Sequence, residues 1–128
     1  MSRTRLRIGI QKSGRLADRS LAMLSKAGLD FDLRKDRLLH ACRDFPVDLM
    51  LVRDDDIPPY VSDGVCDLGI VGENAVRETV WAAPTSHGDG VERLLNLGFG
   101  SCRLVIAVPE QSPHTGPETL QGARVATS

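Results

Sequence analysis

One cation and three carboxylates stand together at residues 53–56, in the order Arg-Asp-Asp-Asp, directly after an apolar run over 47–52. A helical pattern over 56–65 follows, so the acidic run is predicted to lie in a turn between a strand and a helix. Such carboxylates could bind ribose hydroxyls, or a magnesium ion through one or two of their oxygens. An ordinary helix start is equally open, because Asp55 or Asp56 could cap the helix and match its dipole.

Two other strand ends carry groups suited to a ligand. An apolar strand over 6–10 leads into Gln-Lys-Ser-Gly-Arg at 11–15, and the helical pattern that follows stops at Gly28. The lysine, the arginine and the free N–H groups of a new helix suit an anion. The segment lacks the Gly-x-x-x-x-Gly-Lys-Ser/Thr pattern of a phosphate loop, so an ordinary turn stays open. A third strand is predicted over 67–72, with Glu73 opening the next helix.

The rest of the sequence predicts the strands and helices that position these turns. Apolar segments over 37–42 and 47–53 flank a Phe-Pro break and are predicted to be neighbouring strands. Further expected elements are an exposed loop over 83–90, strands over 91–97 and 102–108, a loop over 109–117, a short helical turn, and the start of a strand before residue 128. Alternating strands and helices predict an α/β fold with a largely parallel sheet, in which ligands bind beyond the carboxyl ends of the strands.

Composition excludes several classes of function. The chain has 128 residues and a formal net charge of −1, without the basic block of a nucleic-acid or anionic-membrane surface. No apolar run approaches the roughly 18 residues of a membrane span, and no signal sequence precedes the first strand, so a cytoplasmic protein is expected. Cys42, Cys66 and Cys102 do not fit a zinc pattern and are predicted to be reduced, mostly buried thiols.

Five segments, in order, resemble one enzyme family. They are Leu-Arg-Ile-Gly-Ile-Gln-Lys-Ser-Gly-Arg-Leu at 6–16, Val-Arg-Asp-Asp-Asp-Ile-Pro at 52–58, Asp-Gly-Val-Cys-Asp-Leu-Gly-Ile-Val-Gly-Glu-Asn at 63–74, Phe-Gly-Ser-Cys-Arg-Leu at 99–104 and Ala-Arg-Val-Ala-Thr-Ser at 123–128. Together they resemble ATP phosphoribosyltransferase, the first enzyme of histidine biosynthesis, in its long, histidine-regulated form.

The resemblance implies a transferase reaction. N1 of the adenine of ATP attacks the anomeric carbon of phosphoribosyl pyrophosphate and releases pyrophosphate, which magnesium accompanies without a dedicated protein site. The implied fold is a two-lobed catalytic unit like the type II periplasmic binding proteins, with the active site between the lobes. Residues 1–95 would form the first α/β lobe, nearly complete, and residues 96–128 would begin a truncated second lobe.

The resemblance also implies the site residues, although it assigns no catalytic side chain. The reaction needs positioning and charge stabilisation more than a protein nucleophile, because the substrates bring both nucleophile and leaving group. The phosphate and base region would be lined by Gln11, Lys12, Ser13, Gly14 and Arg15. Ribose, cation or adenine would meet Arg53, Asp54, Asp55 and Asp56, and the floor of the cleft would be Asp67, Gly72 and Glu73.

The chain departs from the family pattern in what it lacks. Family members carry an Asp-Leu-Val-x-Ser/Thr-Gly-x-Thr segment that holds the 5-phosphate, and a carboxyl-terminal domain that binds histidine as feedback inhibitor; neither is present in these 128 residues. The expectation is an inactive fragment that keeps part of the ATP pocket. The family forms dimers and hexamers.

Two other classes of function fit part of the sequence. A phosphorelay receiver would use Asp54 as phosphoacceptor, but it needs an acidic pair where this chain has Gln11 and Lys12, and a lysine where Val108 precedes the late proline. A non-catalytic module that binds adenine nucleotides or other small ligands is the stronger rival, because the same fold hosts both kinds of function.

Overall fold

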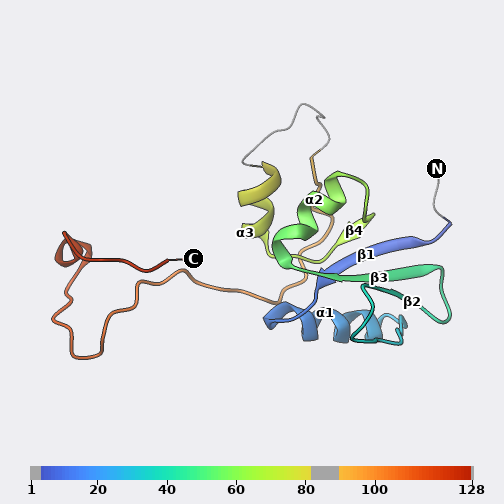
Figure 1. The fold of residues 1–128 in the computed structure, drawn as a ribbon, viewed down its shortest axis with the longest axis horizontal. Coiled ribbons are helices and arrows are strands. Elements are labelled where there is room, and N and C mark those ends of the chain that lie inside the picture. Colours follow the sequence, from blue (N-terminus) through green and yellow to red (C-terminus); the bar gives the residue numbers. More distant parts are fainter. Residues whose placement is uncertain (1–3, 82–89, 128) are drawn as a thin grey trace.

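A four-stranded sheet forms the centre of the computed structural model, which describes residues 4–81 and 90–127 (Figure 1). The strands are β1 (Leu6–Gln11), β2 (Leu39–Ala41), β3 (Val47–Val52) and β4 (Leu68–Gly69), in the order β2-β3-β1-β4. β1 runs parallel to both β3 and β4, whereas β2 pairs antiparallel with β3. The α/β class, the mainly parallel sheet and the pairing of the second and third strands are thus confirmed.

Helices cover both faces of the sheet. α1 (Arg15–Lys26) lies on one face, and α2 (Ile57–Ser62) and α3 (Glu73–Val76) lie on the other (Figure 1). Shorter turns are η1 (Asp54–Asp56), η2 (Arg77–Trp81) and η3 (Pro117–Leu120). α1 ends at the predicted place, because Gly28 adopts a φ of +85° that glycine accepts at little cost.

Two apolar layers hold these elements together, one on each face of the sheet. The first contains the buried residues Ile8, Ile10, Leu24, Cys42, Val47 and Leu49, and the second contains Met50, Val52, Ile57 and Cys66. The period-2 alternation of the strands sends successive side chains to opposite layers, and α1 and α2 cover one layer each. Cys42 and Cys66 are buried thiols and Cys102 is an exposed one, and none of the three is in a disulfide, so the prediction of reduced, mostly buried thiols is confirmed.

Glycines permit the close approach of α2 to the sheet. A Cβ atom added at Gly69 would lie 2.5 Å from Cγ2 of Ile57 and 3.2 Å from Cγ2 of Val61. Gly9, its partner on β1, faces Cys66 Sγ and the same isoleucine. The helix can therefore seat Ile57, which is 1% exposed, directly on the backbone of β1 and β4.

The carboxyl-terminal part differs from the prediction. Within 90–127 the only regular element described is η3, so the strands expected over 91–97 and 102–108, and the strand start before 128, are absent there. This stretch passes the sheet domain and then extends away from it (Figure 1). A strand requires a hydrogen-bonding neighbour, and an apolar β pattern without one stays extended and solvated. The third predicted strand is also shorter than 67–72, since β4 covers two residues.

The remaining predictions concern the loop at 83–90 and membrane-spanning segments. The predicted loop at 83–90 lies outside the described residues except for Gly90. None of the helices described is both long and apolar enough to cross a bilayer.

Candidate functional site

The loops after β1 and β3 are joined at one edge of the sheet. Gln11 and Val52 are partners at the ends of the two parallel strands, and the backbone N–H of Lys12 donates to the carbonyl oxygen of Val52 at 2.8 Å. Arg53 follows Val52 directly. The sequence-predicted anion loop and the acidic turn therefore start side by side, as expected at the carboxyl edge of a parallel pair.

The third turn reaches the same edge from the other side of β1. Gly9 and Gly69 are partners in the β1–β4 pair, and the N–H of Ile70 donates to the carbonyl of Gly9 at 3.0 Å. The chain then continues to Gly72 and to Glu73, the first residue of α3, and α3 contacts η1. Because β1 is the middle strand of the three, its loop lies between the turns that carry Arg53 and Glu73.

The loop after β1 depends on a glycine and presents polar groups. Gly14 has a φ of +109°, and a Cβ there would lie 2.9 Å from Nε2 of Gln11, so only glycine fits this conformation. Gly14 is the N-cap of α1 and supplies no capping side chain, which leaves first-turn N–H groups for a ligand. Lys12, Ser13 and Arg15 are exposed, and Oε1 of Gln11 is buried with no partner among the described atoms.

The acidic turn is organised by an ion pair. Arg53 donates from Nε to Asp56 at 2.9 Å and from Nη2 at 3.3 Å. This hydrogen bond, with the charge of Asp56, raises the pKa of the Arg53 guanidinium above its ordinary value. Asp56 stands at the N-cap of α2 but makes no side-chain capping bond, so its carboxylate orients Arg53 instead. Asp54 and Asp55 make no side-chain bond within the described residues.

Glu73 is likewise paired. Its Oε1 accepts from Nη2 of Arg77 at 2.8 Å and from Nε at 3.2 Å, and Nη1 of Arg93 lies 3.7 Å away. The bond from Arg77 and its charge lower the pKa of the Glu73 carboxyl, with a smaller effect from Arg93. This ion pair with Arg93 connects the start of the carboxyl-terminal stretch to α3.

Asp67 does not belong to this group. It precedes β4, and its Oδ2 accepts the backbone N–H of Arg7 near the start of β1 at 2.8 Å. The N–H of Asp67 in turn donates to the carbonyl of Arg7 at 2.9 Å. The residue thus lies near the amino ends of β1 and β4, away from the edge that carries Lys12. The structure therefore does not bring Asp67 to the edge that carries Lys12 and Arg53, because Asp67 closes the β1–β4 pair at the opposite end.

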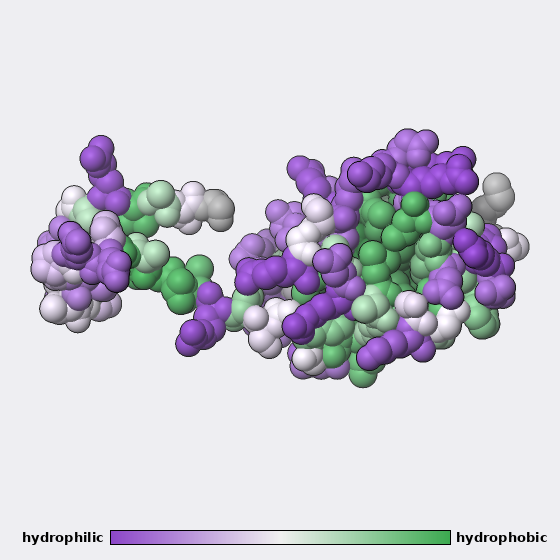
Figure 2. All heavy atoms as spheres, turned by 90° about the horizontal axis from the view of Figure 1, so that it is seen from below, coloured by the Kyte–Doolittle hydropathy of each residue, from purple (hydrophilic) through white to green (hydrophobic). Residues whose placement is uncertain are grey.

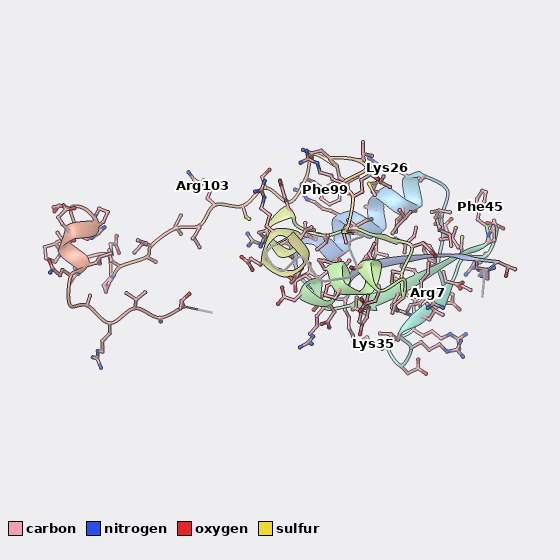
Figure 3. The ribbon with its side chains drawn as sticks, turned by 90° about the horizontal axis from the view of Figure 1, so that it is seen from above. Arg7, Lys26, Lys35, Phe45, Phe99 and Arg103 are labelled. Carbon is pink, nitrogen blue, oxygen red and sulfur yellow. The ribbon has the colours of Figure 1, made fainter. Side chains whose placement is uncertain are left out.

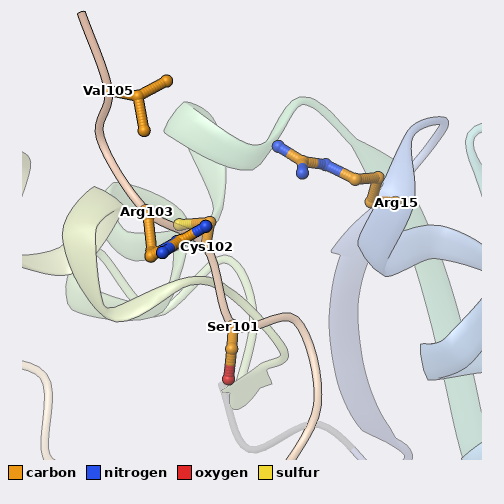
Figure 4. Close-up of a pocket in the computed structure, with 5 residues that line it drawn as sticks. All are labelled: Arg15, Ser101, Cys102, Arg103 and Val105. Atoms are coloured by element: carbon orange, nitrogen blue, oxygen red, sulfur yellow. The ribbon is translucent and has the colours of Figure 1, made fainter.

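A hollow connects α1 with the carboxyl-terminal stretch. This open depression of about 430 Å³ is lined by Arg15, Ser101, Cys102, Arg103 and Val105 (Figure 4). Figure 3 places Arg103 where the extended stretch leaves the sheet domain, and Phe45, which precedes β3, at the other end of the domain. Two of the lining side chains are guanidinium groups, which could attract an anion.

The sequence did not predict the four lining residues on the carboxyl-terminal stretch, which are Ser101, Cys102, Arg103 and Val105. Ser101, Cys102 and Arg103 lie at 99–104, a segment that resembles the family, but no strand-end pattern singles them out. The signal that could have found them is the glycine pair that flanks Phe99. Gly100 has a φ of +77°, and its Cβ would meet Cδ2 of Leu16, so the stretch approaches the start of α1 closely.

No group of three or more His, Cys, Asp or Glu side chains that could hold an ion occurs in 4–81 or 90–127. Of the three aspartates in η1, Asp56 is taken up by Arg53, while Asp54 and Asp55 could contribute at most one or two carboxylates. That donor set fits magnesium which arrives with a phosphorylated ligand, the usual way this ion is held.

The fold and this edge define a class of protein. It is an α/β domain whose ligand-binding groups follow adjacent parallel strands at the carboxyl edge of the sheet. The profile of the HisG family, described as ATP phosphoribosyltransferase, matches residues 53–128, and the chain belongs to this family.

Two relatives give the extent of the similarity. An ATP phosphoribosyltransferase of Stenotrophomonas maltophilia (strain R551-3) is 52% identical over 129 residues, which cover 99% of this chain and 42% of the relative. The solved ATP phosphoribosyl transferase (HisG:HisZ) complex from Thermotoga maritima is 33% identical, over 58% of this chain and 36% of that one, with a TM-score of 0.47. The chain therefore spans less than half the length of the curated relative.

Proposed function

We propose that this chain is part of an ATP phosphoribosyltransferase that joins phosphoribose to N1 of ATP, with release of pyrophosphate, in the first step of histidine biosynthesis. The observation that carries the proposal is the arrangement of Lys12, Arg53 and Glu73 on loops of three adjacent strands in a chain of this family. Both substrates are polyanions with ribose groups, and the edge offers cations beside carboxylates.

The loop residues divide naturally between the parts of the substrates. Gln11, Lys12, Ser13, Gly14 and Arg15 surround a phosphate or the base, with the N–H groups of α1 directed at an oxyanion. Arg53, held by Asp56, takes a second anionic group, and Asp54 and Asp55 accept ribose hydroxyls. Gly72 and Glu73 close the edge beside β4. Magnesium accompanies the pyrophosphate and neutralises its charge.

These residues promote transfer by placement and by electrostatics. The nucleophilic nitrogen and the leaving group both come from the substrates, so the protein must hold two anions close together with the anomeric carbon in line. Cations from the loop at 11–15 and from Arg53 offset the charge that develops on the departing pyrophosphate. No step requires a proton transfer by a named side chain.

A second lobe would complete the site. Residues 1–95 form the first lobe in this proposal, and the second lobe starts at 96 in a fold like the type II periplasmic binding proteins. The closed core of 4–81 and the exposed apolar stretch after Phe99 support this division. The hollow between Arg15 and Arg103 lies where the chain passes from one unit to the next. A cytoplasmic location, assembly into dimers or hexamers, and histidine inhibition through a further domain belong to the same proposal.

The 128-residue chain alone is proposed to bind adenine nucleotides without turnover, because it spans 42% of its curated relative. Isothermal calorimetry with ATP, AMP and free amino acids tests this. Binding of nucleotides but not of amino acids supports the proposal, and the reverse pattern supports a non-catalytic module for other ligands. Formation of phosphoribosyl-ATP by this chain, followed by ultraviolet absorbance, would contradict the absence of turnover while leaving the assigned reaction intact.

A further inference from the structure

The first turn of α2 offers no backbone N–H to a ligand. An N-cap side chain normally accepts the N–H of the second or third helical residue. Counted from Asp56 at the N-cap, these residues are Pro58 and Pro59, which have no N–H. The N–H of Ile57, the first helical residue, already donates to the carbonyl oxygen of Asp54. Asp56 therefore cannot cap α2, and the first turn of α2 cannot bind an anion through its backbone.

The helix after β1 differs in this respect. The N-cap of α1 is Gly14, and none of residues 15–17 is a proline, so its first turn keeps N–H groups that suit an anion. At the turn after β3, the donors must come from a side chain. Arg53 is the one basic residue between Val52 and Ser62. The two neighbouring loops thus need different kinds of donor for the same kind of ligand.

Asp56 holds the guanidinium of Arg53 from one side. Its carboxylate accepts from Nε at 2.9 Å and from Nη2 at 3.3 Å. A guanidinium has five N–H groups in a fixed plane, so these bonds leave one N–H of Nη2 and both N–H groups of Nη1. The remaining donors form one edge of a planar fork, and such an edge matches two oxygens of a phosphate group.

The ion pair contributes little to folding. The Arg53 side chain is 83% exposed and the Asp56 side chain is 32% exposed, and exposed pairs of this kind add little stability. In the view of Figure 2, hydrophilic residues cover much of the surface of the sheet domain, where water and salt screen such charges. Orientation of the guanidinium is the role that the geometry of the pair supports.

We propose that Asp56 is a positioning residue, which holds Arg53 ready to bind a phosphate group of a substrate in place of the backbone donors that Pro58 and Pro59 remove from α2. This inference rests on the proposed function, because it takes the ligand of this edge to be phosphorylated. Asp56 itself does not touch the substrate. Because the arginine is already held, less side-chain freedom is lost when the anion binds.

Isothermal calorimetry of the 128-residue chain with ATP and with inorganic pyrophosphate tests the proposal. Asp56→Asn removes the charge-assisted bond to Arg53 and also removes one negative charge. Loss of the charge alone would strengthen anion binding, whereas loss of orientation should weaken it by about twofold to tenfold, the cost of ordering one long side chain. Asp63→Asn, at the exposed C-cap of α2, is the matched control and should leave the affinity unchanged. Equal or tighter binding by Asp56→Asn overturns the proposal.

A double-variant cycle separates positioning from direct contact. If Asp56 acts through Arg53, Asp56→Asn should cause no further loss of affinity in an Arg53→Gln background. The same loss in both backgrounds would show that the Asp56 carboxylate binds the ligand itself, which contradicts the proposal.

Nitrogen-15 relaxation of the Arg53 Nε–Hε group measures the orientation directly. Restricted motion is expected in the wild type and greater motion in Asp56→Asn, with the melting temperature nearly the same. Equal motion in both proteins, or a melting temperature that falls together with the affinity, would rule out a positioning role. If the wild-type chain binds neither ATP nor pyrophosphate, the proposed function fails as well. If the wild type binds and Asp56→Asn binds equally, only the role of Asp56 fails.

Discussion

The backbone N–H of Lys12 donates to the carbonyl oxygen of Val52 at 2.8 Å, which fixes the loop after β1 beside the turn after β3. This bond continues the β1–β3 pairing by one residue. The register of the two strands therefore fixes the distance between two loops whose side chains are mostly exposed. The cations of the first loop and Arg53 of the second therefore face solvent at one edge of the sheet. Their side chains are not part of the buried core that stabilises the domain. Because the backbone positions these loops, their side chains can be substituted at little cost in stability.

Arg15→Ala or Asp54→Asn in the complete enzyme should lower kcat/KM by about tenfold to a hundredfold, the usual effect of losing a charge-assisted bond to substrate. The melting temperature should stay nearly unchanged, because Arg15 is exposed and Asp54 makes no side-chain bond in the described chain. Arg19→Ala, an exposed arginine one turn along α1, is the control for each assay. If stability falls as much as activity, these turns have a structural role.

Asp67→Ala should lower the stability of the domain and leave substrate binding unchanged. It removes the acceptor of the Arg7 N–H and should cost about 1 kcal/mol in the free energy of unfolding, because the bond is solvent-exposed. Urea denaturation measures this cost, with Asp44→Ala in an exposed turn as control. KM values for both substrates should not change. A raised KM with unchanged stability would return Asp67 to the substrate site.

Gly69→Ala should destabilise the domain by about 1–3 kcal/mol, since its Cβ would lie 2.5 Å from Cγ2 of the buried Ile57. Thermal unfolding should show a lower midpoint. Gly90→Ala is a matched control with open space around its Cβ, and it should be close to neutral. Equal stability of the two variants would mean that α2 shifts freely on the sheet.

Arg77→Gln should raise the pKa of Glu73, because Arg77 supplies both the hydrogen bond and the largest charge that lower it. Carbon-detected NMR titration of the Glu73 carboxyl measures the change. Arg93→Gln should raise the pKa less, since this guanidinium lies 3.7 Å away and has the smaller effect. An equal shift in both variants would contradict this order.

The same ion pair predicts the direction of its pH dependence. A carboxyl whose pKa is lowered in the folded state adds stability at pH values above its unfolded pKa. That contribution is lost as the pH falls through the lowered, folded pKa. Because Glu73 and Arg77 are solvent-exposed, high salt should weaken this dependence. Acid titration of wild type and Arg77→Gln at two salt concentrations would show a smaller acid sensitivity in the variant.

Much of the secondary structure of the domain could be predicted from the spacing of apolar residues along the sequence. The apolar run at 47–52 and the helical spacing after Gly14 predicted β3 and α1, because each pattern matches the period of its element. The predicted strands at 91–97 and 102–108 were wrong for the described chain, because a β pattern specifies a tendency to pair and does not supply the partner. Arg103 and Ser101 were missed as lining residues for the same reason: their place beside Arg15 depends on the path of the chain.

By itself, the sequence determined which loops carry cations and carboxylates, the places of β1, α1 and β3, and the family resemblance, since each depends on residue order alone. Only the tertiary structure decided that β1 lies between β3 and β4, which brings Lys12, Arg53 and Glu73 to one edge. It also placed Asp67 at the other end and joined Arg53 to Asp56. These relationships arise from strand order and register, which contacts between distant parts of the chain determine.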